Sequence, residues 1–383
     1  MPLASRLRIG VVAAEPSGDR LGSGVVAALL KRAPTVELRG IGGPELGRLG
    51  LQSACDIHDL SIMGLEDLWQ KLPNALKIRN RLISDFSRDP PDLFLGIDSP
   101  DFNLNVERRL RKLGIPVMHL VSPTVWAWRG YRVRKIRKAV DRILVLFPFE
   151  KSFYEKRGVP ATFVGHPAAR ETAHLSKEGS RNLFALVPNQ KIVSILPGSR
   201  ESEIRHLSST FVASIRRLAE ADPALFFLIP FASGRIKQQF LSLVSLEGLA
   251  GRIRLVDGQA RECLAASDVA LLASGTAALE AALVGCPMVV AYRVSELSYR
   301  VARALASTHI VSMPNHLMPE PLVPEFLQKE ATEENLVPAV QQLLLDTGAR
   351  QRMRDSLLRI QEVLNMDTNE QIVDTILEKV ERR

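Results

Sequence analysis

Residues 96–103, GIDSPDFN, place two carboxylates directly after an apolar run that is typical of a buried strand. Ser99 followed by Pro100 predicts a helix start, with serine as the N-cap and proline at the first helical position. Asp101 then falls in the first turn, where its charge favours the positive end of the helix dipole. Asp98 has no such structural task. It could shape the turn or act as a general base, and these residues alone leave both open.

A second stretch, LLASGTAALE (271–280), has the composition of a phosphate-binding turn. Ser274, Gly275 and Thr276 lie between an apolar run and a helical pattern, and the N–H groups at such a helix start favour phosphate. Glu280 lies one turn after Thr276 on the same helix face, where its carboxylate could accept ribose hydroxyls. The alternative is a helix capped by serine or threonine with an incidental glutamate.

The stretch ILPGSRESEI (195–204) is also compatible with phosphate. Gly198 and Ser199 begin the turn, and Arg200 could form paired hydrogen bonds to a diphosphate and stabilise a departing group. The alternative for Arg200 is a solvated side chain in a connecting loop. Two glycine-rich turns nearer the N-terminus, 14–22 and 40–47, match neither G-x-G-x-x-G at the first strand–helix turn nor the P-loop pattern, which disfavours a dinucleotide or P-loop site.

Apolar runs rich in β-forming residues alternate with helical segments along most of the chain. The runs are apolar on both faces, so we predict an α/β protein of parallel strands covered by helices. A polar stretch, 168–190, separates two series of runs. We predict an N-terminal domain at 1–170, a C-terminal domain at 185–350 and C-terminal helices at 351–383. Two doubly wound, Rossmann-like domains facing a cleft would bring their strand ends around a shared ligand.

The composition limits the classes of partner. The chain has 50 Lys and Arg against 42 Asp and Glu, and this net charge of +8 favours a nucleotide, a phosphorylated lipid, an anionic membrane or a nucleic acid. Cys55, Cys263 and Cys286 form no C-x-x-C pair, so we expect neither a disulfide framework nor a zinc site. The first apolar run ends at Glu15, and no run of 18 apolar residues exists. We therefore predict a cytoplasmic protein, or one at a membrane surface.

Nine segments, in order along the chain, resemble motifs of the lipid-A-disaccharide synthase family (glycosyltransferase family 19). They are AEPSGD (14–19), SIMGLEDL (61–68), GIDSPDFN (96–103), HLVSPTVWAWR (119–129), LFPFE (146–150), VGHP (164–167), LPGSRESEI (196–204), LLASGTAALE (271–280) and SMPN (312–315). The resemblance is collinear over nearly the whole chain, and several of the motifs are long and unusual. One departure is Ala14, where the family usually has glycine before the glutamate.

The resemblance implies a glycosyltransferase B fold without a metal or cofactor. It implies inverting transfer of 2,3-diacylglucosamine from UDP-2,3-diacylglucosamine to 2,3-diacylglucosamine 1-phosphate (lipid X), which yields a β-1,6-linked disaccharide 1-phosphate and UDP. On this basis Asp98 would take the proton from the 6-hydroxyl of the acceptor. Arg200 and the helix start at 274–276 would stabilise the departing UDP, Glu280 would bind ribose, and Asn315 could hydrogen-bond the diphosphate or the sugar.

The same resemblance assigns the remaining candidate residues. Gly198 and Ser199 would contact the UDP-sugar, and Glu15, Ser17 and Asp19 of the first motif would contact the acceptor. No D-x-D pair occurs in the turns described above, which is consistent with phosphate charge balanced by arginine and a helix dipole.

Two segments could contact a membrane. The stretch 61–82 has apolar residues at helical spacing with Lys and Arg alongside, as in an interfacial helix, although an amphipathic helix packed on a sheet is the alternative. The stretch 126–142 has seven Arg and Lys beside two Trp, which suits anionic lipid head groups, although such a run is usually a solvated face. We expect peripheral association with the inner face of the inner membrane and no nucleic-acid partner. Whether the C-terminal helices cross back to the first domain or exchange between the chains of a homodimer is left open.

Two other classes of protein share this architecture. Another sugar-nucleotide enzyme, such as a UDP-GlcNAc 2-epimerase or a different lipid-linked glycosyltransferase, would keep the nucleotide site but would not require the amphipathic stretch 61–82. A non-catalytic, two-lobed binding protein would normally carry a secretion signal and would not need Asp98. The motifs taken together favour the synthase.

Overall fold

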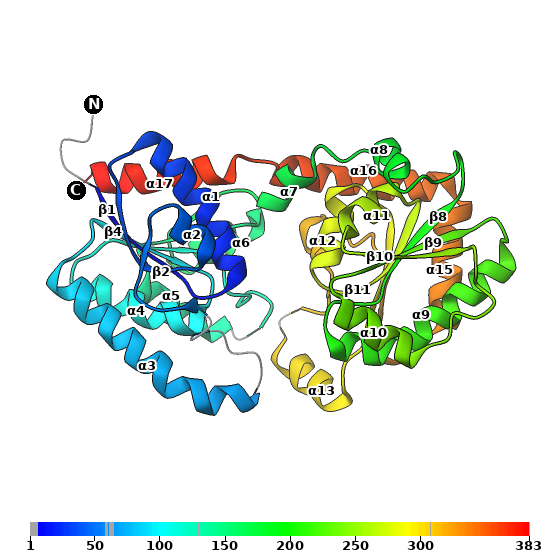
Figure 1. Cartoon of the computed structure of the whole chain (residues 1–383), viewed down its shortest axis with the longest axis horizontal. Helices are drawn as coiled ribbons and strands as arrows, with labels where there is room; N and C mark the ends of the chain where they lie inside the picture. The colour runs from blue at the N-terminus through cyan, green and yellow to red at the C-terminus, as the bar shows by residue number, and fades with distance from the viewer. Residues whose placement is uncertain (1–6, 58–59, 61–64, 129, 307, 383) are drawn as a thin grey trace. The chain divides into compact units, whose positions relative to one another are not determined.

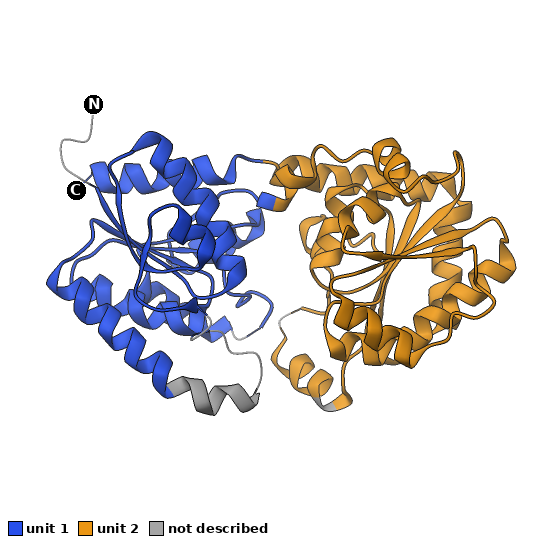
Figure 2. Ribbon diagram, viewed as in Figure 1, with its two compact units in different colours: residues 1–167, 366–383 blue, residues 168–365 orange. Residues whose placement is uncertain are grey.

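The computed structural model describes residues 7–57, 60, 65–128, 130–306 and 308–382, without the side chains of 65–72 and 297. The chain divides into two compact units, Met1–Pro167 with Met366–Arg383 and Ala168–Asn365 (Figure 2). Strands and helices alternate within both units (Figure 1). Each unit therefore has its own sheet and its own covering helices.

The first unit contains a seven-stranded parallel sheet with the strand order β3-β2-β1-β4-β5-β6-β7. Its strands are β1 (Arg8–Ala13), β2 (Glu37–Ile41), β3 (Gln52–Ser53), β4 (Leu93–Ile97), β5 (Val117–Leu120), β6 (Arg142–Val145) and β7 (Ala161–Phe163). The order reverses between β1 and β4, as in doubly wound folds. Ligands of such folds bind at the carboxyl ends of the strands beside this reversal.

Helices cover both faces of this sheet because its strands are apolar on both sides. They are α1 (Pro16–Arg32), α2 (Pro44–Arg48), α3 (Leu65–Arg88), α4 (Pro100–Lys112), α5 (Val133–Ala139), α6 (Pro148–Glu155) and α17 (Thr368–Glu381). Successive strand residues point to opposite faces. In β1, Val11 joins the core with α1 and α17, whereas Val12 joins the core with α3, α4 and α5.

The second unit has a six-stranded parallel sheet with the strand order β10-β9-β8-β11-β12-β13, which reverses between β8 and β11. Its strands are β8 (Ile192–Leu196), β9 (Phe226–Phe231), β10 (Ile253–Asp257), β11 (Val269–Ala273), β12 (Met288–Tyr292) and β13 (Glu325–Leu327). Its helices are α8 (Lys177–Leu183), α9 (Glu201–Ala221), α10 (Gly234–Leu243), α11 (Ala260–Ala266), α12 (Thr276–Leu283), α13 (Glu296–Leu305), α14 (Met313–Leu317), α15 (Glu333–Leu345) and α16 (Thr347–Leu364); α7 (Pro167–Thr172) lies where the two units join.

The C-terminal helices are shared between the units. Helix α16 packs against α12 in the second unit, whereas α17 packs against α1 in the first (Figure 1). Ile372 and Ile376 of α17 belong to the core of the first unit, and Arg32 of α1 lies 3.6 Å from Glu370. The C-terminal helices that we placed at 351–383 thus belong to different units, and the end of the chain returns to the first unit, one of the two alternatives left open above.

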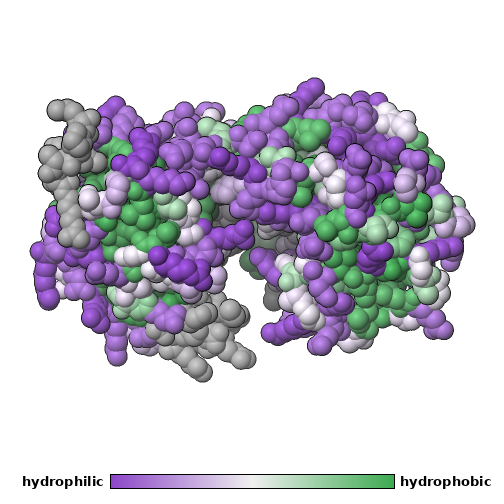
Figure 3. Space-filling view, turned by 45° about the horizontal axis from the view of Figure 1, so that its top comes forward, coloured by the Kyte–Doolittle hydropathy of each residue, from purple (hydrophilic) through white to green (hydrophobic). Residues whose placement is uncertain are grey.

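No helix among the described residues is long and apolar enough to cross a membrane. The face seen in Figure 3 is mostly hydrophilic, and its apolar atoms gather in patches within each unit. The stretch 61–82 lies partly outside the described residues, including the side chains of Ile62, Leu65, Leu68, Trp69 and Leu72. Further along α3, Leu82 and Phe86 pack in the core, as in the alternative that we gave for this stretch.

Candidate active site

Two turns meet at the strand-order reversal of the first unit. Glu15 follows β1, and Asp98 and Ser99 follow β4, whose last residue, Ile97, pairs with Ala13 of β1. The Ser99 hydroxyl donates a hydrogen bond to Glu15 Oε1 at 3.0 Å. The structure therefore brings together the first and third motifs of the sequence at the edge where a doubly wound fold binds its ligand.

The backbone at this edge is strained. Asp98, Ser99 and Val121 have φ values of 51°, 43° and 76°, in the left-handed region that residues other than glycine rarely adopt. Asp98 and Ser99 follow β4, and Val121 follows the neighbouring strand β5. Each such residue costs about 1–3 kcal/mol, and such residues cluster at functional sites. The strain at Asp98 and its neighbours supports a functional role for this turn.

The helix after Asp98 begins as predicted, but Ser99 does not cap it in the predicted way. Ser99 is at the N-cap position and Pro100 is the first residue of α4, yet the serine side chain makes no capping hydrogen bond. A side-chain cap normally requires an extended N-cap backbone. Because Ser99 is left-handed, its hydroxyl instead contacts Glu15. Asp101 lies in the first turn, as predicted, and pairs with Arg132.

Asp19, predicted to contact the acceptor, has a task in the fold. Its side chain is buried, and its oxygens accept the backbone N–H groups of Gly43 at 2.8 Å, Glu45 at 3.0 Å and Leu46 at 3.2 Å. Asp19 therefore caps the start of α2 from another helix, and its contact with the acceptor stays a prediction. Ser17 and Glu15, the other predicted acceptor residues, are exposed in the structure.

We expect Asp19→Ala to lower the free energy of unfolding by about 2 kcal/mol, because it leaves three N–H groups at a helix start without their acceptor. Asp19→Asn, which keeps one oxygen acceptor, should lose less. Urea unfolding measures both. At a temperature where both variants are folded, a wild-type KM for lipid X would leave Asp19 with its task in the fold alone, and a raised KM with unchanged stability would place it at the acceptor site.

A buried polar network at the ends of β5 and β6 was not assigned from the sequence. Glu150 Oε1 accepts a hydrogen bond from Trp126 Nε1 at 3.1 Å, and Glu150 Oε2 accepts one from the Phe147 N–H at 3.2 Å. Ser122 Oγ and Tyr154 Oη are 2.9 Å apart in the same region. Burial raises the pKa of Glu150 to about 7, against the smaller opposing effect of its hydrogen bonds. Ser122 and Trp126 fall in the family-like motif 119–129, and Phe147 and Glu150 fall in 146–150, so the motifs were the available signal; Tyr154 lies outside them.

The raised pKa of Glu150 predicts a pH-dependent stability. Between its unfolded pKa of 4.5 and its folded pKa of about 7, the folded state keeps a proton that the unfolded state releases. Stability is therefore full below pH 4.5 and falls as the pH rises towards 7, by on the order of 3 kcal/mol. Glu150→Gln should remove this fall in urea unfolding measured from pH 4.5 to 8. Glu155 is exposed on the same helix, and Glu155→Gln should keep the fall in stability. If the fall persists in both variants, a group other than Glu150 causes it.

The two phosphate-compatible turns of the second unit lie beside its own strand-order reversal. Ser199 and Arg200 follow β8, Gly275 and Thr276 follow β11, and the two strands are paired. Gly275 has a φ of 146° and is the N-cap of α12, and both Gly275 and Thr276 are exposed. The Ser274 hydroxyl donates a hydrogen bond to the Val311 carbonyl at 3.0 Å, which fixes the turn between β11 and α12. The start of α12 is thus open at the expected edge.

The start of α9 is occupied by its own glutamate. Glu203 Oε2 accepts the N–H groups of Ser199 at 2.9 Å and Arg200 at 3.3 Å, a position that an anion could otherwise take. Gly198 makes room for it, since a Cβ there would lie 2.5 Å from Glu203 Cβ. The Arg200 side chain is 81% exposed and 3.8 Å from Glu203. A glutamate three residues after a helix N-cap was the sequence signal for this contact.

Glu280 has a partner that the sequence did not indicate. Thr276 and Glu280 share α12, as predicted, but Glu280 Oε1 accepts a hydrogen bond from Arg261 Nε at 2.9 Å. Arg261 also lies 2.6 Å from Glu171 Oε2. A ribose would therefore share the Glu280 carboxylate with Arg261, which belongs to α11.

The side chain of Asn315, a predicted substrate contact, is bonded within the fold. Its Nδ2 donates to the Val323 carbonyl at 2.9 Å and to Glu325 Oε1 at 2.7 Å. Its Oδ1 accepts the N–H groups of Leu322 and Val323, both at 3.0 Å. All four hydrogen-bonding positions of the amide are taken, and the side chain is buried. In the structure, Asn315 fixes the loop between α14 and β13, and its contact with the diphosphate or the sugar stays a prediction.

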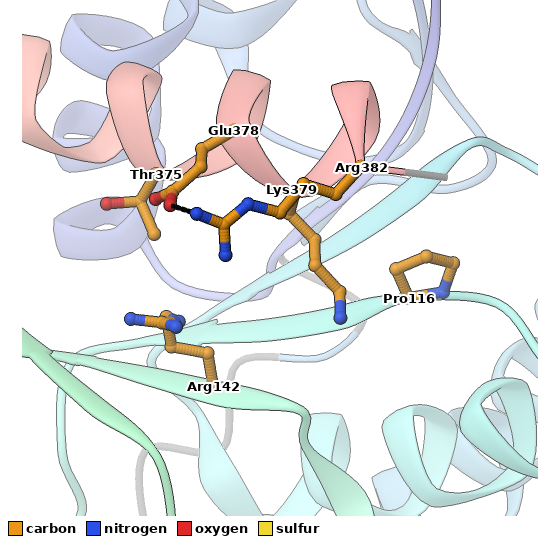
Figure 4. A pocket seen from close by; sticks show the side chains of 6 residues that line it. All are labelled: Pro116, Arg142, Thr375, Glu378, Lys379 and Arg382. Carbon is orange, nitrogen blue, oxygen red and sulfur yellow. Dashed lines mark ion pairs between the residues drawn. The ribbon is translucent and has the colours of Figure 1, made fainter.

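A cavity of about 290 Å³ in the first unit lies away from these turns (Figure 4). Lys379 of α17 extends towards the strands, and Arg142 is the first residue of β6. Pro116 directly precedes β5. The cavity therefore lies at the amino ends of the strands, opposite the edge that carries Asp98.

Among the described residues, no group of three His, Cys, Asp or Glu is arranged to hold a metal.

Comparison with known proteins gives one family. The model of the family described as lipid-A-disaccharide synthetase matches residues 9–376. The lipid-A-disaccharide synthase of Alkalilimnicola ehrlichii is 42% identical over 374 residues, which is 97% of this chain and 98% of that protein. The lipid-A-disaccharide synthase of Pseudomonas paraeruginosa is 42% identical over 386 residues and covers 100% of both chains.

Solved structures with low sequence identity share the fold. A UDP-GlcNAc 2-epimerase from Neisseria meningitidis bound to UDP-GlcNAc has a TM-score of 0.62 and 16% identity, over 97% of this chain and 99% of that one. The glycotransferase of kitacinnamycin has a TM-score of 0.63 and 15% identity, over 98% and 99%. Together with the two parallel, doubly wound sheets, these structures confirm the predicted α/β, glycosyltransferase B fold.

Proposed function

The chain belongs to the lipid-A-disaccharide synthase family of glycosyltransferases, and from this premise we propose that it transfers 2,3-diacylglucosamine from UDP-2,3-diacylglucosamine to lipid X. The observation that carries the proposal is the position of Asp98. It is a carboxylate on a strained turn at the strand-order reversal of the first unit. The second unit carries an exposed helix start and an exposed arginine at its own reversal.

Asp98 acts as the general base in this proposal. The 6-hydroxyl oxygen of lipid X attacks the anomeric carbon of the donor from the side opposite UDP, and Asp98 takes the hydroxyl proton. The new bond joins the two sugars with inversion, and the bond from the anomeric carbon to UDP breaks. Because UDP leaves with the electron pair of that bond, its diphosphate gains negative charge in the transition state.

The second unit binds the donor and stabilises that charge. The exposed N–H groups at the start of α12, at Gly275 and Thr276, face the diphosphate, and Arg200 supplies a positive charge to it. Glu280 accepts the ribose hydroxyls beside Arg261, which orients its carboxylate. The Neisseria epimerase, whose structure holds UDP-GlcNAc, supports nucleotide-sugar binding by this fold.

The acyl chains of both substrates place the enzyme at a membrane surface. We propose that it associates peripherally with the inner face of the inner membrane, where lipid X is presented to Glu15 and Ser17. The basic stretch 126–142 supports this contact through Trp128 and Tyr131, which are 38% and 67% exposed, whereas Trp126 is half-buried and bonds Glu150.

The proposal is tested by UDP release from UDP-2,3-diacylglucosamine with and without lipid X. Release that requires lipid X, with formation of the disaccharide 1-phosphate, supports it. Release without lipid X would indicate hydrolysis or the chemistry of a UDP-GlcNAc 2-epimerase. No release under either condition would contradict both the synthase and the epimerase as the function of this chain.

A further inference from the structure

A buried polar cluster lies next to the Asp98 turn. Asn103 and Glu107 are one turn apart on α4, His119 lies in β5, and all three residues are 0% exposed. His119 Nδ1 and Glu107 Oε1 are 2.6 Å apart. Burying a carboxylate and an imidazole is costly, and apolar side chains of similar volume often stabilise a core as well or better. The cluster therefore suggests a role beyond stability.

Strand β4 is shaped to admit this cluster. Gly96 lies opposite His119 in the register of β4 and β5. A Cβ at Gly96 would lie only 2.0 Å from Glu107 Oε1 and 3.4 Å from Asn103 Cβ. Any larger residue would displace the carboxylate. Glycine at this position lets the cluster contact the backbone of β4 two residues before Asp98.

Within the cluster, Asn103 makes the hydrogen bonds to the Asp98 backbone. Asn103 Nδ2 donates to the carbonyl oxygen of Asp98 at 2.7 Å and to that of Ile97 at 3.2 Å. From β5, the carbonyl of Leu120, the residue after His119, accepts the Asp98 N–H at 2.9 Å. A left-handed aspartate persists only where its surroundings hold it. Here the holding contacts come from α4 and β5.

The charges of the cluster also act at this turn. Burial alone would lower the pKa of His119, but Glu107, together with the charge of Asp98, outweighs burial and raises it. Asn103 Oδ1, Glu107 Oε2 and His119 Nε2 are buried without a hydrogen-bond partner among the described residues. Such groups are rare in cores and call for an explanation.

We propose that Asn103, Glu107 and His119 are positioning residues for Asp98. They hold its backbone in the left-handed conformation, so that its carboxylate stays at the carboxyl edge of the sheet where it can take the proton of the acceptor. The inference rests on the proposed function, because it concerns Asp98 as the base. The alternative is a polar pair that only stabilises the first unit.

A double-mutant cycle between Glu107→Gln and Asp98→Asn separates these alternatives. With saturating lipid X, Glu107→Gln alone should lower kcat for UDP release about tenfold or more and leave the KM of both substrates within about twofold. In the Asp98→Asn background, the same substitution should change kcat less than about twofold, because the base that it positions is gone. Leu29→Ala, in the α1 core of the same unit, is the control for lost stability and should have the same effect in both backgrounds.

A second variant covers the case in which Glu107→Gln does not fold. Glu107→Met combined with His119→Met replaces the pair by apolar side chains, and it should fold but show the same low kcat. An unchanged kcat in either folded variant, or an equal loss in both Asp98 backgrounds, would overturn the positioning role while lipid X-dependent release by the wild type stands. A wild type without lipid X-dependent release would overturn the proposed function and this inference with it.

Discussion

Asp98→Asn is expected to lower kcat for lipid X-dependent UDP release by about 10²- to 10⁴-fold, the usual contribution of a general base. Asparagine has nearly the same size as aspartate and can keep the turn, but its amide cannot take a proton from the 6-hydroxyl of the acceptor. The KM for UDP-2,3-diacylglucosamine should change little, because the donor contacts in the proposal come from the second unit. Steady-state UDP release with both substrates varied separates kcat from KM.

Asp101→Asn is the matched control for Asp98→Asn. Asp101 lies three residues further along the chain, in the first turn of α4, and it pairs with Arg132. It should retain wild-type kcat, since its task is electrostatic support of the helix start. Full activity of Asp98→Asn would leave Asp98 with a structural task in its turn, and equal losses in both variants would indicate general damage to the start of α4.

Arg200→Ala is expected to have the second large effect, a loss of about 10²- to 10³-fold in kcat, as for removal of a group that stabilises charge only in the transition state. The Arg200 side chain is 81% exposed and lies 3.8 Å from Glu203, so its removal should leave the stability of the second unit nearly unchanged. Arg200→Lys should recover part of the rate, because lysine supplies the charge without paired hydrogen bonds.

Arg205→Ala is the control for Arg200→Ala. Arg205 is exposed on the second turn of α9, five residues after Arg200, and it should keep wild-type kcat. Circular dichroism and urea unfolding of both variants check that the fold is intact. If Arg200→Ala raises only the KM of the donor, Arg200 contributes to binding and does not stabilise the departing UDP.

The sequence by itself determined the architecture and the edge at which the chemistry is placed. Runs that are apolar on both faces require helices on both sides of a parallel sheet, and β1 shows this directly, with Val11 and Val12 in opposite cores. The turns with Asp98, Arg200 and Gly275 each follow such a run. Because parallel strands end at one edge, their order along the chain was enough to predict that these residues lie at the carboxyl ends of the strands.

Only the tertiary structure decided which polar residues have partners within the fold. Asp19 and Asn315 have the residue types of a binding site, yet Asp19 caps α2 and Asn315 fixes a loop. The partners of Glu107 and Glu280 come from other elements, and α17 returns to the first unit. Local spacing sets the period and ends of an element, whereas a hydrogen-bond partner depends on which elements pack together. Those contacts are non-local, so the pattern of the sequence does not contain them.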